Sequence, residues 1–142
     1  MVKMIVLCCI LFSFSTVCFS QDRDENIVRD LLQSQAQQWN AGNIKQFMST
    51  YWNNDSLMFI GKNGITYGWQ KTMDNYIKGY PDTTSMGKLN FDLLSVKRIS
   101  VEYFFVVGKW HLRRTIGDLA GSFTLLVKKI KGRWSIVADH SS

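Results

Sequence analysis

Cysteine is almost absent from this chain. The three cysteines among its 142 residues are Cys8, Cys9 and Cys18, and all of them lie in the N-terminal apolar segment or at its edge. If that segment is removed on export, the remaining domain has no disulfide and no thiol for catalysis, although it enters an oxidising compartment. A hydrophobic core must then hold the domain together without cross-links.

The chain also lacks an apolar run long enough for a transmembrane helix. Its N-terminal segment, residues 4–17, follows Lys3 and is succeeded almost at once by the charged residues 22–25. A membrane-spanning helix requires about 20 apolar residues, whereas a short apolar run after a basic residue is typical of a signal peptide. We therefore expect export, and no stable membrane insertion after cleavage.

Small residues at Cys18 and Ser20 predict that the signal peptide is cleaved after Ser20. Lipidation of Cys18 is not expected, because the bulky Val17 precedes it where lipoprotein processing requires a small residue. The sequence thus predicts a signal peptide over residues 1–20 and one domain over residues 21–142. The expected location is the periplasm of a Gram-negative bacterium or the extracellular medium.

Histidine occurs only twice, at His111 and His140. A metal site needs three or four converging ligands, and strand alternation places these two on opposite faces, so we expect no metal and no cofactor. Without the signal peptide the domain keeps 16 basic and 11 acidic residues, a net charge of +5. An exported domain without a recognisable nucleic-acid motif favours solvated strand edges for these basic residues, and no nucleic-acid partner.

Helical periodicity dominates the first half of the domain. Apolar positions recur every three or four residues over 24–40, and Asn43 is placed to cap a second, shorter helix whose stripe runs over residues 44–52. A third helix is expected after Gly68 and is terminated by Pro81, the only proline in the chain. These segments predict three helices.

In the second half of the domain the helical periodicity gives way to the two-residue alternation of β-strands. Residues 56–60 and 65–67 predict a short hairpin around Asn63 and Gly64. Four longer strands follow, joined by turns too short for crossovers, over residues 89–99, 101–114, 119–130 and 133–140. The predicted fold class is α+β, a cone in which three helices pack on a curved, mostly antiparallel six-stranded sheet and enclose a pocket.

The strand registers predict which side chains face that pocket. If Gly117-Asp118 and Lys131-Gly132 form the turns, one face of the sheet is apolar until it ends on His140. Its members are Trp110, Leu112, Phe123, Leu125, Val127, Trp134, Ile136, Ala138 and His140. His111 and Asp139 fall on the outer face, Asp139 to anchor a loop or pair with Arg113. A β-bulge or a one-residue slip would exchange the faces.

Several motifs, taken in order, resemble a known superfamily. They are Trp39-Asn40-Ala41-Gly42-Asn43, Phe47, Tyr51-Trp52-Asn53-Asn54-Asp55, Gly68 at a helix start, and a C-terminal Gly-x-Trp-x-Ile that leads to Asp139-His140-Ser141-Ser142. The chain is similar to proteins of the nuclear transport factor 2, ketosteroid isomerase and SnoaL-like superfamily, and in particular to the secreted bacterial branch classed as domain of unknown function 4440. The resemblance implies a cone with a pocket and a homodimer.

The resemblance does not extend to isomerase chemistry. That reaction needs an ionised aspartate as base, with a tyrosine and a protonated aspartate to hold the enolate oxygen. Counted from the shared Asn40-Ala41-Gly42, the family's tyrosine position falls on Gln35 and its base position falls near Phe59. Neither side chain can perform the corresponding step.

Polar-tipped and aromatic side chains supply the candidate pocket residues: Trp39, Tyr51, Phe59, Trp69, Tyr76, Trp110, Trp134 and His140. Aromatic stripes at helical spacing also fit an ordinary core, and His140 could equally be held by a backbone carbonyl as by a ligand. His140 is the one candidate for acid or base catalysis, since a neutral imidazole titrates near working pH.

Two function classes follow from these residues. The first is an exported pocket protein that binds a small hydrophobic or aromatic molecule, with His140 as polar anchor. The alternative is a non-enzymatic periplasmic module for interaction or dimerisation. Apolar residues on the otherwise polar outer face favour a homodimer: Phe105, Val107, Leu126 and Val137.

Overall fold

The computed structural model describes residues 15–142 of the chain, and side chains from residue 23 onward. The predicted signal peptide falls largely outside these residues, and its cleavage stays a prediction. None of the helices in the described part of the chain has the length and apolarity to cross a membrane. The helices are α2 (Ser15–Asn40), α3 (Ile44–Met48), α4 (Trp69–Gly79) and α5 (Thr83–Met86). The strands are β1 (Met58–Gly61), β2 (Gly64–Tyr67), β3 (Lys88–Ser100), β4 (Tyr103–Arg113), β5 (Leu119–Ile130) and β6 (Arg133–Ser141).

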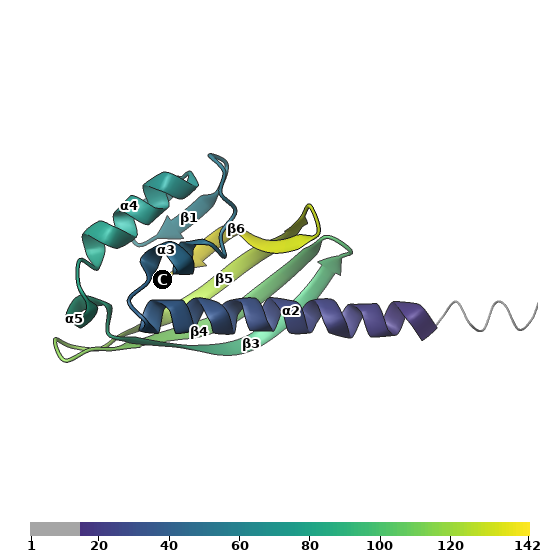
Figure 1. Cartoon of the computed structure of the whole chain (residues 1–142), viewed down its shortest axis with the longest axis horizontal. Coiled ribbons are helices and arrows are strands. Elements are labelled where there is room, and N and C mark those ends of the chain that lie inside the picture. Colours follow the sequence, from purple (N-terminus) through teal and green to yellow (C-terminus); the bar gives the residue numbers. More distant parts are fainter. Residues whose placement is uncertain (1–14) are drawn as a thin grey trace, which may run out of the picture.

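The six strands form one sheet in the order β2-β1-β6-β5-β4-β3. Strands β3 to β6 make the predicted antiparallel meander, whereas β1 pairs with β6 in parallel. Helix α2 runs along one side of β3 to β5, and α3 and α4 lie on the same side over β1 and β6 (Figure 1). The predicted α+β class and the mostly antiparallel sheet are confirmed.

Helix α2 packs its apolar stripe onto the inner face of the sheet. Val28 and Leu32 are fully buried, as the helical spacing predicts. They join the buried cluster that Phe104, Val106 and Ile136 contribute from the strands. Burial of each such side chain stabilises the fold by about 1.5–3 kcal/mol relative to exposure. This end of the cone is therefore filled with aliphatic and aromatic side chains.

The helix ends follow local capping chemistry. The side chain of Asn43 accepts a hydrogen bond from the Gln46 amide, which confirms its predicted capping of α3. Gly68 precedes α4 with φ +92°, a conformation that disfavours other residues. No helix is predicted between α4 and β3, yet α5 lies there, because Asp82 and Ser85 form a reciprocal capping box.

Register irregularities bend the long strands. The pairing of β3 with β4 shifts between Leu93 and Ser95 and again between Arg98 and Ser100, and that of β5 with β6 shifts between Leu126 and Val127. Bulges of this kind increase the local twist and bend of a strand. They give the sheet the curvature that leaves space beneath the helices.

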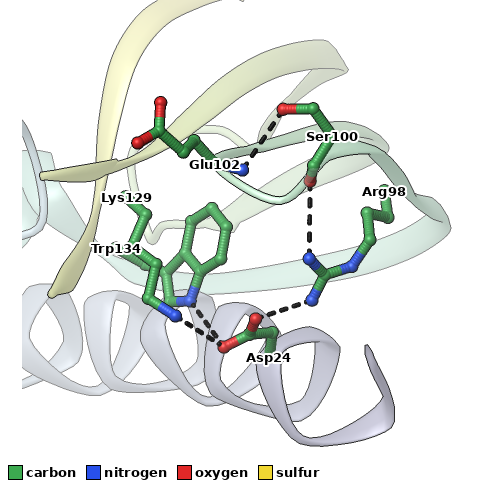
Figure 2. Close-up of polar contacts among 6 residues, drawn as sticks. All are labelled: Asp24, Arg98, Ser100, Glu102, Lys129 and Trp134. Atoms are coloured by element: carbon green, nitrogen blue, oxygen red, sulfur yellow. Dashed lines mark hydrogen bonds and ion pairs between the residues drawn. The ribbon is translucent and has the colours of Figure 1, made fainter. Parts of the chain in front are cut away.

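Asp24 lies where helix α2 begins to pack against the sheet, and its carboxylate contacts side chains of three strands (Figure 2). Its Oδ2 accepts a hydrogen bond from the Arg98 guanidinium on β3 at 2.6 Å. Its Oδ1 lies 3.2 Å from Lys129 Nζ on β5 and 3.3 Å from Trp134 Nε1 on β6. Asp24 is only 8% exposed, so its charge depends on these donors.

Burial by itself raises the pKa of the Asp24 carboxyl. The hydrogen bonds from Arg98, Lys129 and Trp134 outweigh burial, and the pKa lies below its ordinary value. A carboxyl whose pKa is lower in the folded than in the unfolded chain stabilises the fold above the unfolded pKa, about 3.9. That stabilisation is lost as the pH falls through the folded pKa.

We predict that Asp24→Asn lowers the free energy of unfolding by about 1.5–3 kcal/mol at neutral pH, the range for hydrogen bonds to charged groups. Urea denaturation measures this loss. The matched control is Asp30→Asn, because Asp30 is an exposed residue of the same helix. The difference in the free energy of unfolding between wild type and Asp24→Asn should become smaller in acid, where Asp24 is protonated. A difference that does not change with pH would contradict the role of the Asp24 charge.

Candidate functional site

A cavity of about 830 Å³ lies between the inner face of the sheet and helices α2 and α4. Sites that hold small molecules have volumes of about 300–1,000 Å³. Nine aromatic side chains line it: Trp39, Phe47, Tyr51, Phe59, Tyr76, Tyr80, Phe91, Trp110 and Phe123. The cone is thus filled at the Asp24 end and hollow at the other.

Tyr76 of α4 is the centre of the aromatic wall. Its ring centroid lies 5.1 Å from that of Phe47, 5.7 Å from that of Phe59 and 5.9 Å from that of Trp39. These three pairs meet edge to face, a favoured arrangement of aromatic rings. The wall is therefore built from mutually supporting rings contributed by α2, α3, β1 and α4.

Two glycines on the inner face of the sheet make room for its aromatic side chains. A Cβ atom at Gly108 would collide with the ring of Phe123. A Cβ atom at Gly121 would lie 2.8 Å from Trp110 Nε1 and collide with the Ser142 carbonyl. Phe123 and Trp110 can lie low over the sheet only because these positions carry no side chain.

Asp139 of β6 is the one acidic side chain in the cavity lining, and it is 5% exposed. The Tyr51 hydroxyl donates a hydrogen bond to its Oδ2 at 2.7 Å. The Ser141 hydroxyl donates to its Oδ1, also at 2.7 Å. Each carboxylate oxygen is therefore held by a neutral hydroxyl, and among the described residues no ion pair includes Asp139.

A bulge at Val137 turns Asp139 toward the cavity. The pairing of β6 with β5 passes from Ile136 opposite Val127 to Ala138 opposite Leu126, which leaves Val137 as an extra residue. Side chains alternate along a strand, so one extra residue exchanges the faces beyond it. Trp134 and Ile136 point inward before the bulge, and Asp139 points inward after it.

The prediction that His140 lies in the pocket wall is therefore wrong. His140 is exposed on the outer face, pairs across the sheet with Thr124, and does not line the cavity. The register deduced from the Lys131-Gly132 turn is correct as far as Ile136 and fails at the bulge. Asp139 contacts Tyr51 rather than Arg113, contrary to its predicted place on the outer face.

The register between β4 and β5 also differs from the prediction. A turn at Gly117-Asp118 would place Leu112 opposite Phe123, but the loop is longer and Leu112 pairs with Leu119. The shift amounts to four residues on β5, an even number, so no side chain changes face. Trp110, like Leu112, accordingly faces inward as predicted.

Burial raises the pKa of the Asp139 carboxyl above its ordinary value. The hydrogen bonds from Tyr51 and Ser141 act in the opposite direction but do not outweigh burial. The pKa values of Tyr51 and Tyr76 are raised as well, by burial first and then by the negative charge of Asp139. Both phenols stay protonated and able to donate, while Asp139 is the group whose charge can change.

Gln35 of α2 contributes a buried amide to the cavity lining. Its Nε2 donates to Thr50 Oγ1 at 2.7 Å, and the Thr50 hydroxyl itself donates to the Phe47 carbonyl at 2.9 Å. Since the Thr50 proton is already used, its oxygen can only accept, which fixes the orientation of the amide. The carbonyl of Gln35 is the end left to accept a further hydrogen bond.

The structure brings five of the eight predicted pocket residues to the cavity: Trp39, Tyr51, Phe59, Tyr76 and Trp110. Trp69 points elsewhere and donates its indole N–H to the Met48 carbonyl at 2.8 Å. Trp134 packs at the filled end against Asp24 and Phe104. Together with His140 on the outer face, these two tryptophans do not line the cavity.

Sequence reasoning missed Asp139, Gln35 and Tyr80 as cavity residues. Helical spacing would have predicted that Gln35 faces inward, because it follows Leu31 and Leu32 by one helical turn. For Asp139 no comparable signal exists, since its face depends on the bulge. No group of three or more potential ligand side chains within residues 23–142 could hold a metal ion.

Comparison with solved structures identifies similar folds. An NTF-2 like protein of unknown function from Shewanella oneidensis MR-1 shares 41% identity, with a TM-score of 0.80 over 82% of this chain and 97% of that one. An NTF2-like protein of unknown function from Pseudomonas putida KT2440 has a TM-score of 0.68 at 13% identity, covering 85% and 87% of the two chains. A ketosteroid isomerase-like protein from Erwinia carotovora atroseptica SCRI1043 has a TM-score of 0.62 at 15% identity, covering 82% and 93%. No protein-family model and no curated protein matches the chain.

The raised pKa of Asp139 predicts a pH dependence of stability. Its folded pKa exceeds the unfolded value of about 3.9, so the folded chain binds more protons between the two pKa values. The contribution of Asp139 to stability therefore falls as the pH rises through this window. Asp139→Asn should remove that fall, and urea denaturation at pH values from about 4 to 8 measures it. Asp30→Asn should still show the fall in stability as the pH rises. If stability depends on pH in the same way in wild type and in Asp139→Asn, the raised pKa of Asp139 is contradicted.

Proposed function

This chain belongs to the family of NTF2-like proteins, and on that premise we propose that it binds a small, mainly apolar molecule inside the cone. The observation that carries the proposal is a cavity of about 830 Å³ whose aromatic wall contains one buried carboxylate. Apolar walls with a few convergent polar groups are typical of small-molecule sites. Asp139 and Tyr51, rather than His140, are the proposed polar anchors.

The cavity composition favours binding over the ketosteroid type of isomerisation. Gln35 and Phe59, the residues at the family's tyrosine and base positions, both line the cavity, and neither can act as acid or base. The membership in the NTF2-like family fixes the fold rather than a reaction. For proton transfer inside the cavity Asp139 is the candidate, because it is the one buried acidic side chain of the lining and His140 lies on the opposite face.

An open cavity also favours a ligand-binding role over a purely structural one. A module that served only dimerisation would be more stable with a filled cone, since each unfilled volume forfeits packing contacts. The filled end shows that this sequence can pack its inner face tightly. From the predicted signal peptide we further propose that the protein binds its ligand in the periplasm or outside the cell. The assignment to the secreted branch of the superfamily stays a prediction.

The test is native mass spectrometry of the protein purified from its own compartment, followed by release of any retained molecule. Wild type should carry a small molecule, Asp139→Ala should bind the released molecule at least about tenfold more weakly and so retain less of it, and His140→Ala should keep it. The neighbours 139 and 140 are matched controls because they face opposite sides of one strand. A protein that retains nothing and takes up no uncharged dye such as Nile red would refute the proposal.

We also propose a homodimer formed through the outer face of the sheet. One row across that face is apolar, since Met58, Ala138, Leu126 and Phe105 are cross-strand neighbours in turn. Phe105 is 39% exposed in the single chain. Exposed apolar rows of this kind mark interaction surfaces, and a self-complementary face generates a two-fold dimer.

We predict that light scattering gives the mass of two chains at micromolar concentration, and that Phe105→Lys shifts it toward one chain by placing a charge in the interface. Lys97→Ala is a suitable control, because Lys97 pairs with Phe105 at the polar end of the same row. A wild-type protein that stays monomeric at high concentration would exclude the dimer.

A further inference from the structure

The charges around the cavity are unevenly placed. Three charged side chains belong to its lining, namely Asp139, Lys62 and Lys78. Both lysines are exposed, Lys62 in the turn between β1 and β2 and Lys78 in the last turn of α4. Exposed charges at the rim are screened by water and salt, whereas a buried charge is screened much less. Asp139 is therefore the one charged side chain that is buried in the cavity lining.

The hydroxyls around Asp139 are arranged for its ionised form. Tyr51 and Ser141 each use their single proton on a different carboxylate oxygen. A carboxylate has about four acceptor sites, so two remain for a ligand in the cavity. Burial nevertheless disfavours the charge, and no arginine or lysine among the described residues pairs with Asp139. The site lacks a positive partner.

The rings near Asp139 suit a cation as well. Tyr51 is bonded to Asp139, and its ring lies 5.9 Å from that of Phe47. Phe59 of β1 is the parallel-strand neighbour of Asp139, and Tyr76 contacts both Phe47 and Phe59. Aromatic faces attract organic cations, most strongly where water is excluded. The carboxylate thus lies within an aromatic enclosure.

From this juxtaposition we propose that the cavity binds an organic amine in its protonated form, with the ammonium group on Asp139 and the apolar part among the aromatic rings. The inference rests on the proposed ligand-binding function and names its ligand class. The ammonium group supplies the positive partner that the fold omits and donates to the free acceptor sites of Asp139. An anionic ligand would be repelled by the same carboxylate.

Three probes of one shape test the charge preference: 4-phenylbutylamine, 4-phenylbutan-1-ol and 4-phenylbutanoate, titrated calorimetrically into wild type at neutral pH. The amine should bind at least about tenfold more tightly than the alcohol, and the carboxylate most weakly. Asp139→Asn should bring the affinity of the amine to that of the alcohol and leave the alcohol within about twofold. His140→Asn, which changes the outer face only, should alter none of the three.

A measurement on wild type covers the case in which Asp139→Asn fails to fold. Protons compete with the ammonium group for Asp139, so the affinity for the amine should fall in acid while that for the alcohol should not. The titratable groups next to Asp139 are Tyr51 and Tyr76, which stay protonated throughout, and His140, whose charge acts from the other side of the sheet to lower the pKa of Asp139.

The outcomes separate the two levels of the proposal. If the alcohol or the carboxylate binds as tightly as the amine, the amine inference is overturned while the ligand-binding function stands. If none of the probes binds and the purified protein retains no molecule, both are overturned. An amine preference that survives Asp139→Asn would also overturn the inference, because the carboxylate would then not be its cause.

Discussion

The cavity depends on one backbone feature, the bulge at Val137. Strand β6 changes its neighbour at this point. Before the bulge, Ile136 exchanges backbone hydrogen bonds of 2.9 Å with Thr50 and Trp52. After it, Ala138 is paired with Met58 of β1. The extra residue allows the strand to leave one partner and join the next, and it also inverts the alternation of side chains. A single backbone adjustment thus joins β1 to the sheet and turns Asp139 inward.

The two buried aspartates of this chain show opposite solutions to the same electrostatic problem. Asp24 is compensated by Arg98 and Lys129, and its pKa is lowered. Asp139 is held only by neutral hydroxyls, and its pKa is raised. The first arrangement is that of a structural contact, since the strands supply the charges needed to stabilise the carboxylate. The second leaves a carboxyl whose charge is uncompensated within the fold, in contact with an open volume, which is the condition for recognition of an external group.

The sequence predicts those features that depend on local periodicity. The helix over residues 24–40, the Asn43 cap and the antiparallel meander follow from spacing alone, and so do the inward positions of Trp39, Tyr51 and Tyr76. Residues on strands are different, because their face depends on counting from a turn. Residues 133–136 alternate, but Ile136, Val137 and Ala138 are all apolar, so their composition does not show which of them faces inward and does not mark Val137 as an extra residue. Continued alternation through this apolar run misses the bulge, and the assignment of residues 139 and 140 is inverted.

Knowing the face is still not sufficient to know the cavity. Trp110 and Trp134 both point inward from the sheet, yet only Trp110 lines the open volume. The difference lies in the surroundings: Trp134 belongs to the buried cluster that also contains Val28 and Leu32 of helix α2, and it packs against Phe104 and Asp24.

Further along α2 the side chains are larger and are anchored away from the centre. Gln35 donates to Thr50, and Trp39 donates its indole N–H to the Met86 carbonyl at 2.9 Å. Tyr51 is held in the same way by Asp139. Buried donors seldom give up their acceptors, because an unpaired polar group costs about 1–3 kcal/mol. These hydrogen bonds hold the side chains of Gln35, Trp39 and Tyr51 at the periphery of the cavity. The cavity therefore stays open because the polar groups of its lining are bonded to fixed acceptors around it.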